Sequence, residues 1–237
     1  MNPEPTHDFD SYLTPSRCIN SDAPAIVAKA RELTDDNATD LENALKLYYF
    51  VRDSVRYNPY IAEATEESLH ATLTLETGEG WCVSKAVLLA ALCRAIGIPA
   101  RLGFADVVNH LSTERLRAAM QTDVFYFHGY CSIYLEGKWV KSTPAFNLSL
   151  CQKFNLHPLE FNGRDDSLYH EFDQAGNRHM EYINERGEYV DVPVDELQAV
   201  FTKYYGGLSD DAQQPALKSE QWDQDVLAEN NLAASAD

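Results

Sequence analysis

One apolar segment in the middle of the chain restricts how it can fold more than any other feature. Residues 81–96 read WCVSKAVLLAALCRAI, with apolar side chains on every side of the expected helix. Such a helix has to be buried all round. Gly97 follows where a helix end favours glycine, and Pro99 stops the helix from continuing. The segment is therefore predicted to be a central helix around which the remaining elements pack.

Hydrophobic periodicity predicts the elements that surround this helix. Thr39 and Glu42 have the spacing of a capping box and open an amphipathic helix that ends near Tyr57. Residues 61–79 have a mixed pattern and are expected to include a loop that leads into the site. Lys85 in the first turn of the central helix is expected to reach solvent. The other expected elements are a helix over 22–33, a strand over 101–108, a helix over 112–120 capped by Ser112, a hairpin over 124–135 and 138–143, and short strands over 180–183 and 188–192 with a turn at Arg186-Gly187 before the second of them.

These elements predict an α+β fold in which the central helix packs on an antiparallel sheet. One main domain is expected for a chain of 237 residues. We divide it into four parts: an irregular lead-in over 1–20, the core over 21–147, an extension of the same domain over 148–208 with added strands or a lid, and an acidic tail over 209–237.

The net charge of the chain limits which classes of binding partner are expected. The chain has 19 Lys and Arg against 37 Asp and Glu, a formal charge of -18. This charge repels a phosphate backbone and an anionic bilayer, so neither nucleic acid nor membrane is expected as a partner. The N-terminus lacks the pattern of a signal peptide, and no segment approaches the ~20 apolar residues of a membrane span. A cytoplasmic protein is predicted, and its oligomeric state stays open.

The five cysteines are Cys18, Cys82, Cys93, Cys131 and Cys151. Their number is odd and their positions are scattered without a CxxC pair, so neither a disulfide framework nor a zinc site is predicted. No other metal site and no cofactor motif is found, and reduced thiols are expected. Cys93 and Cys131 are interpreted as buried core residues, and Cys18 and Cys151 as loop thiols.

Cys82 is the candidate nucleophile because it opens the central helix. A thiol at a helix N-terminus or beside a histidine can have its pKa lowered, and the free N–H groups of the first turn can hold an oxyanion. Gly80 lets the backbone approach a substrate closely just before it. His128, at the start of a predicted strand, is the candidate base. Taken alone, a cysteine at this position is more often a small buried residue, and a histidine such as His128 is more often a half-buried strand residue.

The segments GWCVSKAVLLAALCRAIGIPARLG and HGYCSIYLEGKWV resemble the transglutaminase-like superfamily, whose members have a papain-like core. The resemblance covers about residues 40–144. It implies a Cys82–His128 pair completed by an Asp on the neighbouring strand, and Thr143 stands at the position of that Asp. Asn147 is the alternative third member. Trp81, Gly80 and Trp139 are interpreted as candidate substrate-binding residues, although the two tryptophans are equally suited to packing.

Two functions from different classes follow from the resemblance. The first is a thiol enzyme that attacks the amide or acyl carbonyl of a peptide or protein, as a peptidase or amidase rather than a cross-linking enzyme. The second, which the missing Asp motivates, is an inactive protein that binds a peptide or protein partner in the same cleft. A third hypothesis gives the acidic C-terminal region an interaction role of its own.

Overall fold

The computed structural model describes residues 9–109, 112–168, 174–176, 180–205 and 219–234. Its helices are α1 (Asp10–Leu13), α2 (Pro24–Leu33), α3 (Asp40–Ser54), α4 (Ala71–Thr77), α5 (Cys82–Ala95), α6 (Glu114–Met120), α7 (Leu148–Lys153), α8 (Val194–Tyr204) and α9 (Trp222–Ala234), with short 3-10 turns at η1 (Pro59–Ile61), η2 (Glu67–Leu69) and η4 (Ser219–Gln221). Its strands are β1 (Arg56–Tyr57), β2 (Glu79–Gly80), β3 (Ala100–Asn109), β4 (Val124–Leu135), β5 (Lys138–Ser142) and β6 (Met180–Tyr189).

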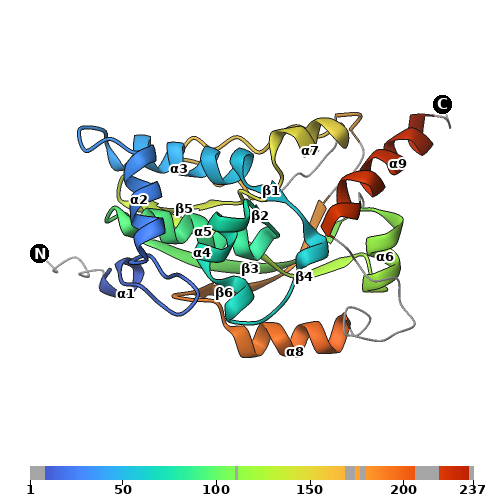
Figure 1. The fold of residues 1–237 in the computed structure, drawn as a ribbon, viewed down its shortest axis with the longest axis horizontal. Helices are drawn as coiled ribbons and strands as arrows, with labels where there is room; N and C mark the ends of the chain where they lie inside the picture. Colours follow the sequence, from blue (N-terminus) through green and yellow to red (C-terminus); the bar gives the residue numbers. More distant parts are fainter. Residues whose placement is uncertain (1–8, 110–111, 169–173, 177–179, 206–218, 235–237) are drawn as a thin grey trace, which may run out of the picture.

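Helix α5 occupies the centre of the core, as its composition predicts. One side packs on β3 and β4, and α2, α3 and α4 cover it from the other side (Figure 1). Every residue from Cys82 to Arg94 is buried. The helix ends at Ile96, and Gly97 takes the left-handed conformation at φ 82°, which a glycine adopts without strain.

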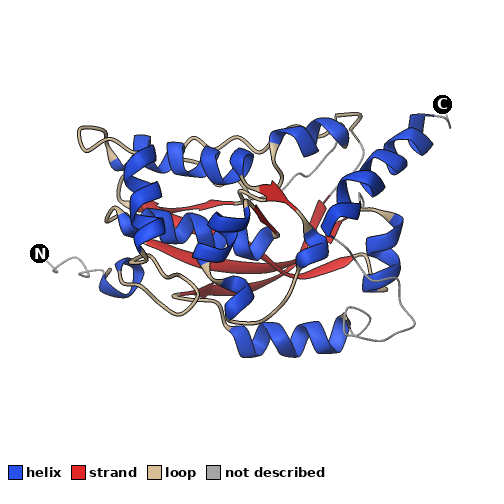
Figure 2. Ribbon diagram, viewed as in Figure 1, coloured by secondary structure: helices blue, strands red, loops and turns tan. Residues whose placement is uncertain are grey.

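The main sheet has the order β5-β4-β3-β6 and is antiparallel throughout (Figure 2). A second, parallel pair joins β1 to β2 just before α5. The predicted hairpin corresponds to β4 and β5, with the turn at Glu136 and Gly137. The predicted α+β fold, with a Cys-bearing helix packed on an antiparallel sheet, is confirmed.

Helix caps follow the sequence signals closely. Thr39 and Glu42 form the predicted capping box, in which the Thr39 hydroxyl accepts from the Glu42 N–H and the Glu42 carboxylate accepts from the Thr39 N–H. For α6 the predicted cap was wrong by one residue: Thr113, not Ser112, accepts from the Leu116 N–H. Either residue type can cap, so the sequence does not decide between neighbours.

Two segments have an order that the sequence did not predict. Within residues 61–79, whose pattern is mixed, α4 forms and packs against α5. The predicted turn at Arg186-Gly187 is instead an irregularity within one strand, β6, which pairs with β3 along its length. Arg186 is the additional residue there, and Gly187 has φ 100°, so the glycine serves a β-bulge rather than a hairpin turn.

Lys85 does not reach solvent, contrary to the prediction. Its side chain is fully buried, and the ammonium donates to the carbonyl oxygens of Arg52, Val55 and Ala145 at 3.1, 2.6 and 2.7 Å. These oxygens belong to the end of α3 and to the segment after β5. Burial lowers the pKa of Lys85 well below its ordinary value. The three carbonyl oxygens match the three N–H donors of the ammonium group.

The C-terminal elements pack onto this core from two directions. α8 follows β6 and contacts β4, while α9 contacts α6 and α7. Trp222 at the start of α9 is buried and contacts Tyr57 and Tyr60 edge-on. Within the described part of the chain, no helix is both long and apolar enough to cross a membrane. The four-part division of the chain stays a prediction.

Candidate active site

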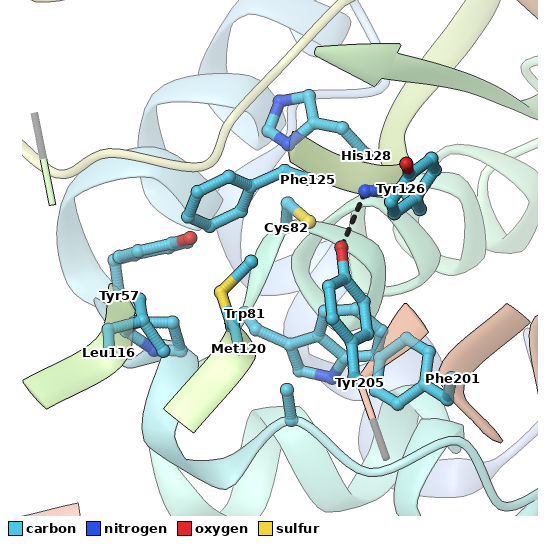
Figure 3. A pocket seen from close by; sticks show the side chains of 12 residues that line it. Tyr57, Trp81, Cys82, Leu116, Met120, Phe125, Tyr126, His128, Phe201 and Tyr205 are labelled. Atoms are coloured by element: carbon cyan, nitrogen blue, oxygen red, sulfur yellow. Dashed lines mark hydrogen bonds between the residues drawn. The ribbon is translucent and has the colours of Figure 1, made fainter. Parts of the chain in front are cut away.

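A small cavity lies at the N-terminal end of α5, beside Cys82 (Figure 3). It has a volume of about 40 Å³. Cys82 and His128 both face it, so the structure brings the two candidate residues to one space. The remaining lining residues are mostly aromatic or aliphatic: Tyr57, Pro59, Ala62, Trp81, Leu116, Met120, Phe125, Tyr126, Phe201 and Tyr205.

Cys82 is held as a buried thiol at the start of α5. Its side chain is 5% exposed, and burial raises its pKa to about 11. The backbone N–H groups of Gly129, Val83 and Cys82 itself act in the opposite direction, because they stabilise a thiolate. Removal from water outweighs these donors, so the buried position of Cys82 favours the thiol at neutral pH.

Gly129 explains how β4 comes close enough to donate to this sulfur. A Cβ atom at position 129 would lie 3.0 Å from the Cα and 3.0 Å from the Cγ2 of Val83. Only a glycine allows the strand backbone to approach the first turn of α5 so closely. Gly129, which follows His128, therefore allows both the histidine and a backbone N–H donor to lie beside Cys82.

A bulge in β4 sets the position of His128. Val107 pairs with Phe125 and Ala105 with His128, so Tyr126 and Phe127 together oppose the single residue Asp106. Phe127 has φ 57°, a left-handed conformation that costs a bulky residue energy. The bulge changes the alternation of the strand just before His128. Phe125 and His128 consequently line the same cavity.

Asp106 holds this bulge and was missed in the sequence analysis. Its buried carboxylate accepts from the Phe127 N–H at 3.1 Å and from Arg186 Nε at 2.5 Å. Asn184 donates to the other oxygen at 3.4 Å. An acidic residue inside the apolar strand RLGFADVV is the signal that could have drawn attention to it.

Comparison with known proteins identifies the core around this site. The family model of the transglutaminase-like superfamily matches residues 27–144, which include Cys82, His128 and Thr143. Through these residues, the chain belongs to the transglutaminase-like superfamily. The match begins in α2 and ends after β5, so α8 and α9 lie outside it. No curated protein matches the chain.

Two solved structures resemble this transglutaminase-like chain. A candidate cysteine protease from Cytophaga hutchinsonii is 21% identical, with a TM-score of 0.44 over 77% of this chain and 54% of its own. A candidate protease from Parabacteroides distasonis is 18% identical, with a TM-score of 0.36 over 56% of this chain and 24% of its own. This chain therefore spans about half the length of the first structure and about a quarter of the second.

Thr143 stands where the transglutaminase-like resemblance implies an Asp. It is buried, and its side chain lines a second cavity of about 10 Å³ together with His128. The Thr143 Oγ1 atom has no hydrogen-bond partner among the described residues. Asn147, the alternative third member, is placed differently: its Oδ1 accepts from the Tyr57 N–H at 3.0 Å and its Nδ2 donates to Ser149 at 2.7 Å. Of the two, Thr143 is the residue that shares a cavity with His128.

The three predicted substrate-binding residues occupy different environments. Trp81 lines the Cys82 cavity and contacts Phe201 edge-on, with ring centroids 5.6 Å apart. Gly80 belongs to β2, and a Cβ there would lie 2.6 Å from Ser84 Oγ, so the glycine allows close packing within the protein. Trp139 packs against Tyr134 and under Arg101 and does not line the cavity.

Proposed function

We propose that this protein is a thiol enzyme in which Cys82 attacks an amide or other acyl carbonyl of a peptide or protein. His128 is the proposed proton carrier. The observation that carries the proposal is the common cavity of Cys82 and His128, together with the backbone N–H groups that face the sulfur. Membership of a superfamily of thiol enzymes supports it. Hydrolysis by a peptidase or amidase is proposed ahead of transfer to an amine.

The proposed reaction has two steps. In the first, His128 takes the thiol proton as the sulfur bonds to the carbonyl carbon, and the backbone N–H groups near Cys82 hold the oxyanion. The C–N bond then breaks, and the leaving amine takes the proton from the imidazolium. In the second, water gives a proton to His128 and its oxygen bonds to the acyl carbon. The acid leaves and the proton returns to the sulfur.

The raised pKa of Cys82 decides which form of the pair is proposed. With a pKa of about 11, the resting residue is a thiol rather than part of a thiolate–imidazolium pair. His128 therefore acts as a general base during the attack, instead of removing the proton beforehand. A reaction of this kind needs a neutral imidazole beside the thiol when the attack begins.

Alkylation of Cys82 by iodoacetamide across a range of pH tests the pair. Peptide mass spectrometry separates Cys82 from the four other buried thiols, of which Cys93 and Cys131 serve as references. We expect labelling at neutral pH to be faster at Cys82 than at those two, and to fall at least tenfold in His128→Ala. Equal labelling of Cys82 in wild type and in His128→Ala, at the rate of Cys93, would contradict the proposal.

A binding protein without catalysis is the second candidate. Two observations favour it: Thr143 replaces the expected Asp, and Cys82 is 5% exposed. An aspartate stabilises an imidazolium, whereas a hydroxyl carries no charge. Incubation with a panel of amide and ester substrates, followed by mass spectrometry of the intact protein, separates the candidates. An acyl adduct on Cys82 identifies the enzyme, and peptide binding that survives Cys82→Ala without any adduct identifies the binding protein.

The cellular setting is also part of the proposal. We propose a cytoplasmic protein with reduced thiols that uses neither a metal nor an organic cofactor, and that has no nucleic-acid or membrane partner. The formal charge of -18 supports the exclusion of anionic partners.

A further inference from the structure

The described residues that line the Cys82 cavity carry no fixed charge. None of them is Asp, Glu, Lys or Arg, although these four types make up 24% of the chain. Burial raises the pKa of Tyr57 and of Tyr205, so both phenols are neutral at physiological pH. A charged group inside this space would lose its hydration without gaining an opposite charge, which is strongly unfavourable.

The size of the cavity sets a second limit. Its volume is about 40 Å³. Because one water takes roughly 10–15 Å³ on this scale, the space holds on the order of three such units. A short aliphatic side chain of three or four carbon atoms has about this size. An indole or a sugar ring is too large for the space as it stands.

The outer wall of the cavity comes from α8, which lies outside the residues that match the family. Phe201 contacts Trp81 on one side and Tyr205 on the other, with ring centroids 5.6 and 5.0 Å apart. The Tyr205 hydroxyl accepts from the Tyr126 N–H at 2.5 Å (Figure 3). It also donates to the Val124 carbonyl at 3.1 Å. Hydrogen bonds to β4 therefore anchor this wall beside the site.

From these observations we infer that the acyl group delivered to Cys82 carries a small, uncharged, apolar side chain, which this cavity holds against Phe201. The inference rests on the proposed function and gives it a substrate class. Phe201 packs edge-on against Trp81 in the wall of the cavity, so the Phe201 side chain limits the size of the group. Because Phe201 is only partly buried, its replacement enlarges the space without opening the core.

Methanethiosulfonate reagents that differ only in their substituent test this inference at Cys82. The propyl, 2-aminoethyl and 2-sulfonatoethyl reagents transfer their thioalkyl group to a thiolate and release a sulfinate. Each rate at Cys82 is divided by the rate of the same reagent with glutathione, which corrects for the intrinsic reactivity of the reagent. The reactions are run in about 0.5 M salt, so that the net charge of the protein is screened. We expect the propyl reagent to be at least tenfold faster than both charged reagents, since each charge must be desolvated.

Size is tested with the larger benzyl reagent. In wild type it should react more slowly than the propyl reagent, and Phe201→Ala should raise the benzyl rate at least fivefold. Phe50→Ala is the matched control, because Phe50 is a partly buried phenylalanine of α3 that does not line the cavity. This control should leave both rates unchanged.

The outcomes separate this inference from the proposed function. Charged and apolar reagents that react equally at Cys82 would overturn the apolar substrate class and leave the thiol enzyme intact. A benzyl rate that Phe201→Ala does not raise would overturn the role of Phe201. Failure of all reagents at Cys82 in the folded protein, with full labelling in urea, would overturn both proposals, since the cavity would then admit no substrate.

Discussion

The carboxylate of Asp106 accepts the backbone N–H of Phe127, the residue that precedes His128, at 3.1 Å. Phe127 is in a left-handed conformation at φ 57°, and Arg186 on β6 binds the same carboxylate oxygen. A buried acid on one strand thus stabilises a strained residue on the next. The strain lies directly beside the candidate base, which is where proteins tend to retain such conformations.

Asp106→Ala is expected to lower the free energy of unfolding by about 2 kcal/mol, because it leaves the Arg186 guanidinium and the Phe127 N–H without their acceptor. Urea denaturation measures this. Alkylation of Cys82 at neutral pH should also slow, since the bulge relaxes and His128 moves. Asp36→Ala, at an exposed position, is the control and should change neither quantity. A destabilised Asp106→Ala protein with an unchanged alkylation rate would show that Asp106 does not position His128.

Gly129→Ala should weaken the contact between β4 and the first turn of α5. The added Cβ would lie 3.0 Å from the Val83 Cα, so the strand has to move away, at a cost of about 1–3 kcal/mol. The Gly129 N–H then moves away from the sulfur and stabilises the thiolate less. The pH at which the alkylation rate of Cys82 reaches half of its maximum should therefore rise. Adding Val83→Ala removes the close contact with Val83 Cγ2 and should restore part of both losses. Wild-type behaviour of Gly129→Ala would contradict the close approach.

Sequence patterns predicted the parts of this fold that depend on neighbouring residues. The central helix, its glycine end, the Thr39 capping box and the β4–β5 hairpin each follow from periodicity or from a local hydrogen bond. The resemblance predicted that Cys82 and His128 act as a pair. Both residues line one cavity, and their catalytic role stays a prediction.

The features that sequence patterns missed depend on contacts between distant segments. The conformation of Phe127 depends on Asp106 and Arg186, which lie on two other strands. The α8 wall depends on the contact between Trp81 and Phe201, which no periodicity encodes. Lys85 was expected at the surface because lysine is rarely buried. Its burial requires carbonyls that only the assembled fold brings together.

Lys85→Met is expected to cost about 3 kcal/mol of the free energy of unfolding. Methionine fills a similar volume but leaves the carbonyls of Arg52, Val55 and Ala145 buried without this donor. Lys46→Met on the exposed side of α3 is the matched control and should change the stability by less than about 0.5 kcal/mol. Equal stability of the two variants in urea would mean that the ammonium contributes nothing net at this position.

The raised pKa of Cys82 predicts a loss of stability at alkaline pH. Because the thiol has a pKa of about 11 when folded and about 9.0 when unfolded, the unfolded chain releases its proton first as the pH rises. The contribution is therefore complete below about pH 9 and is lost towards pH 11. Wild type should lose about 2 kcal/mol more than Cys82→Ala over this window, measured by urea denaturation with a reductant. Parallel curves for the two proteins would contradict the buried thiol.

Thr143→Asp should restore the acid that the superfamily resemblance implies. Thr143 and Asp are similar in size, and the residue at 143 lines a cavity of about 10 Å³ with His128. A carboxylate there would stabilise the imidazolium that forms when His128 takes the Cys82 proton. We expect alkylation of Cys82 by iodoacetamide at neutral pH to become about tenfold faster or more.

Thr143→Asn is the matched control, because asparagine has the same shape as aspartate without the charge. The gain should vanish when His128→Ala is added, since the carboxylate acts through the imidazole. If Thr143→Asp and Thr143→Asn label Cys82 at the same rate, the charge at this position does not act on the pair, and Thr143 is a packing residue of the β5 strand end.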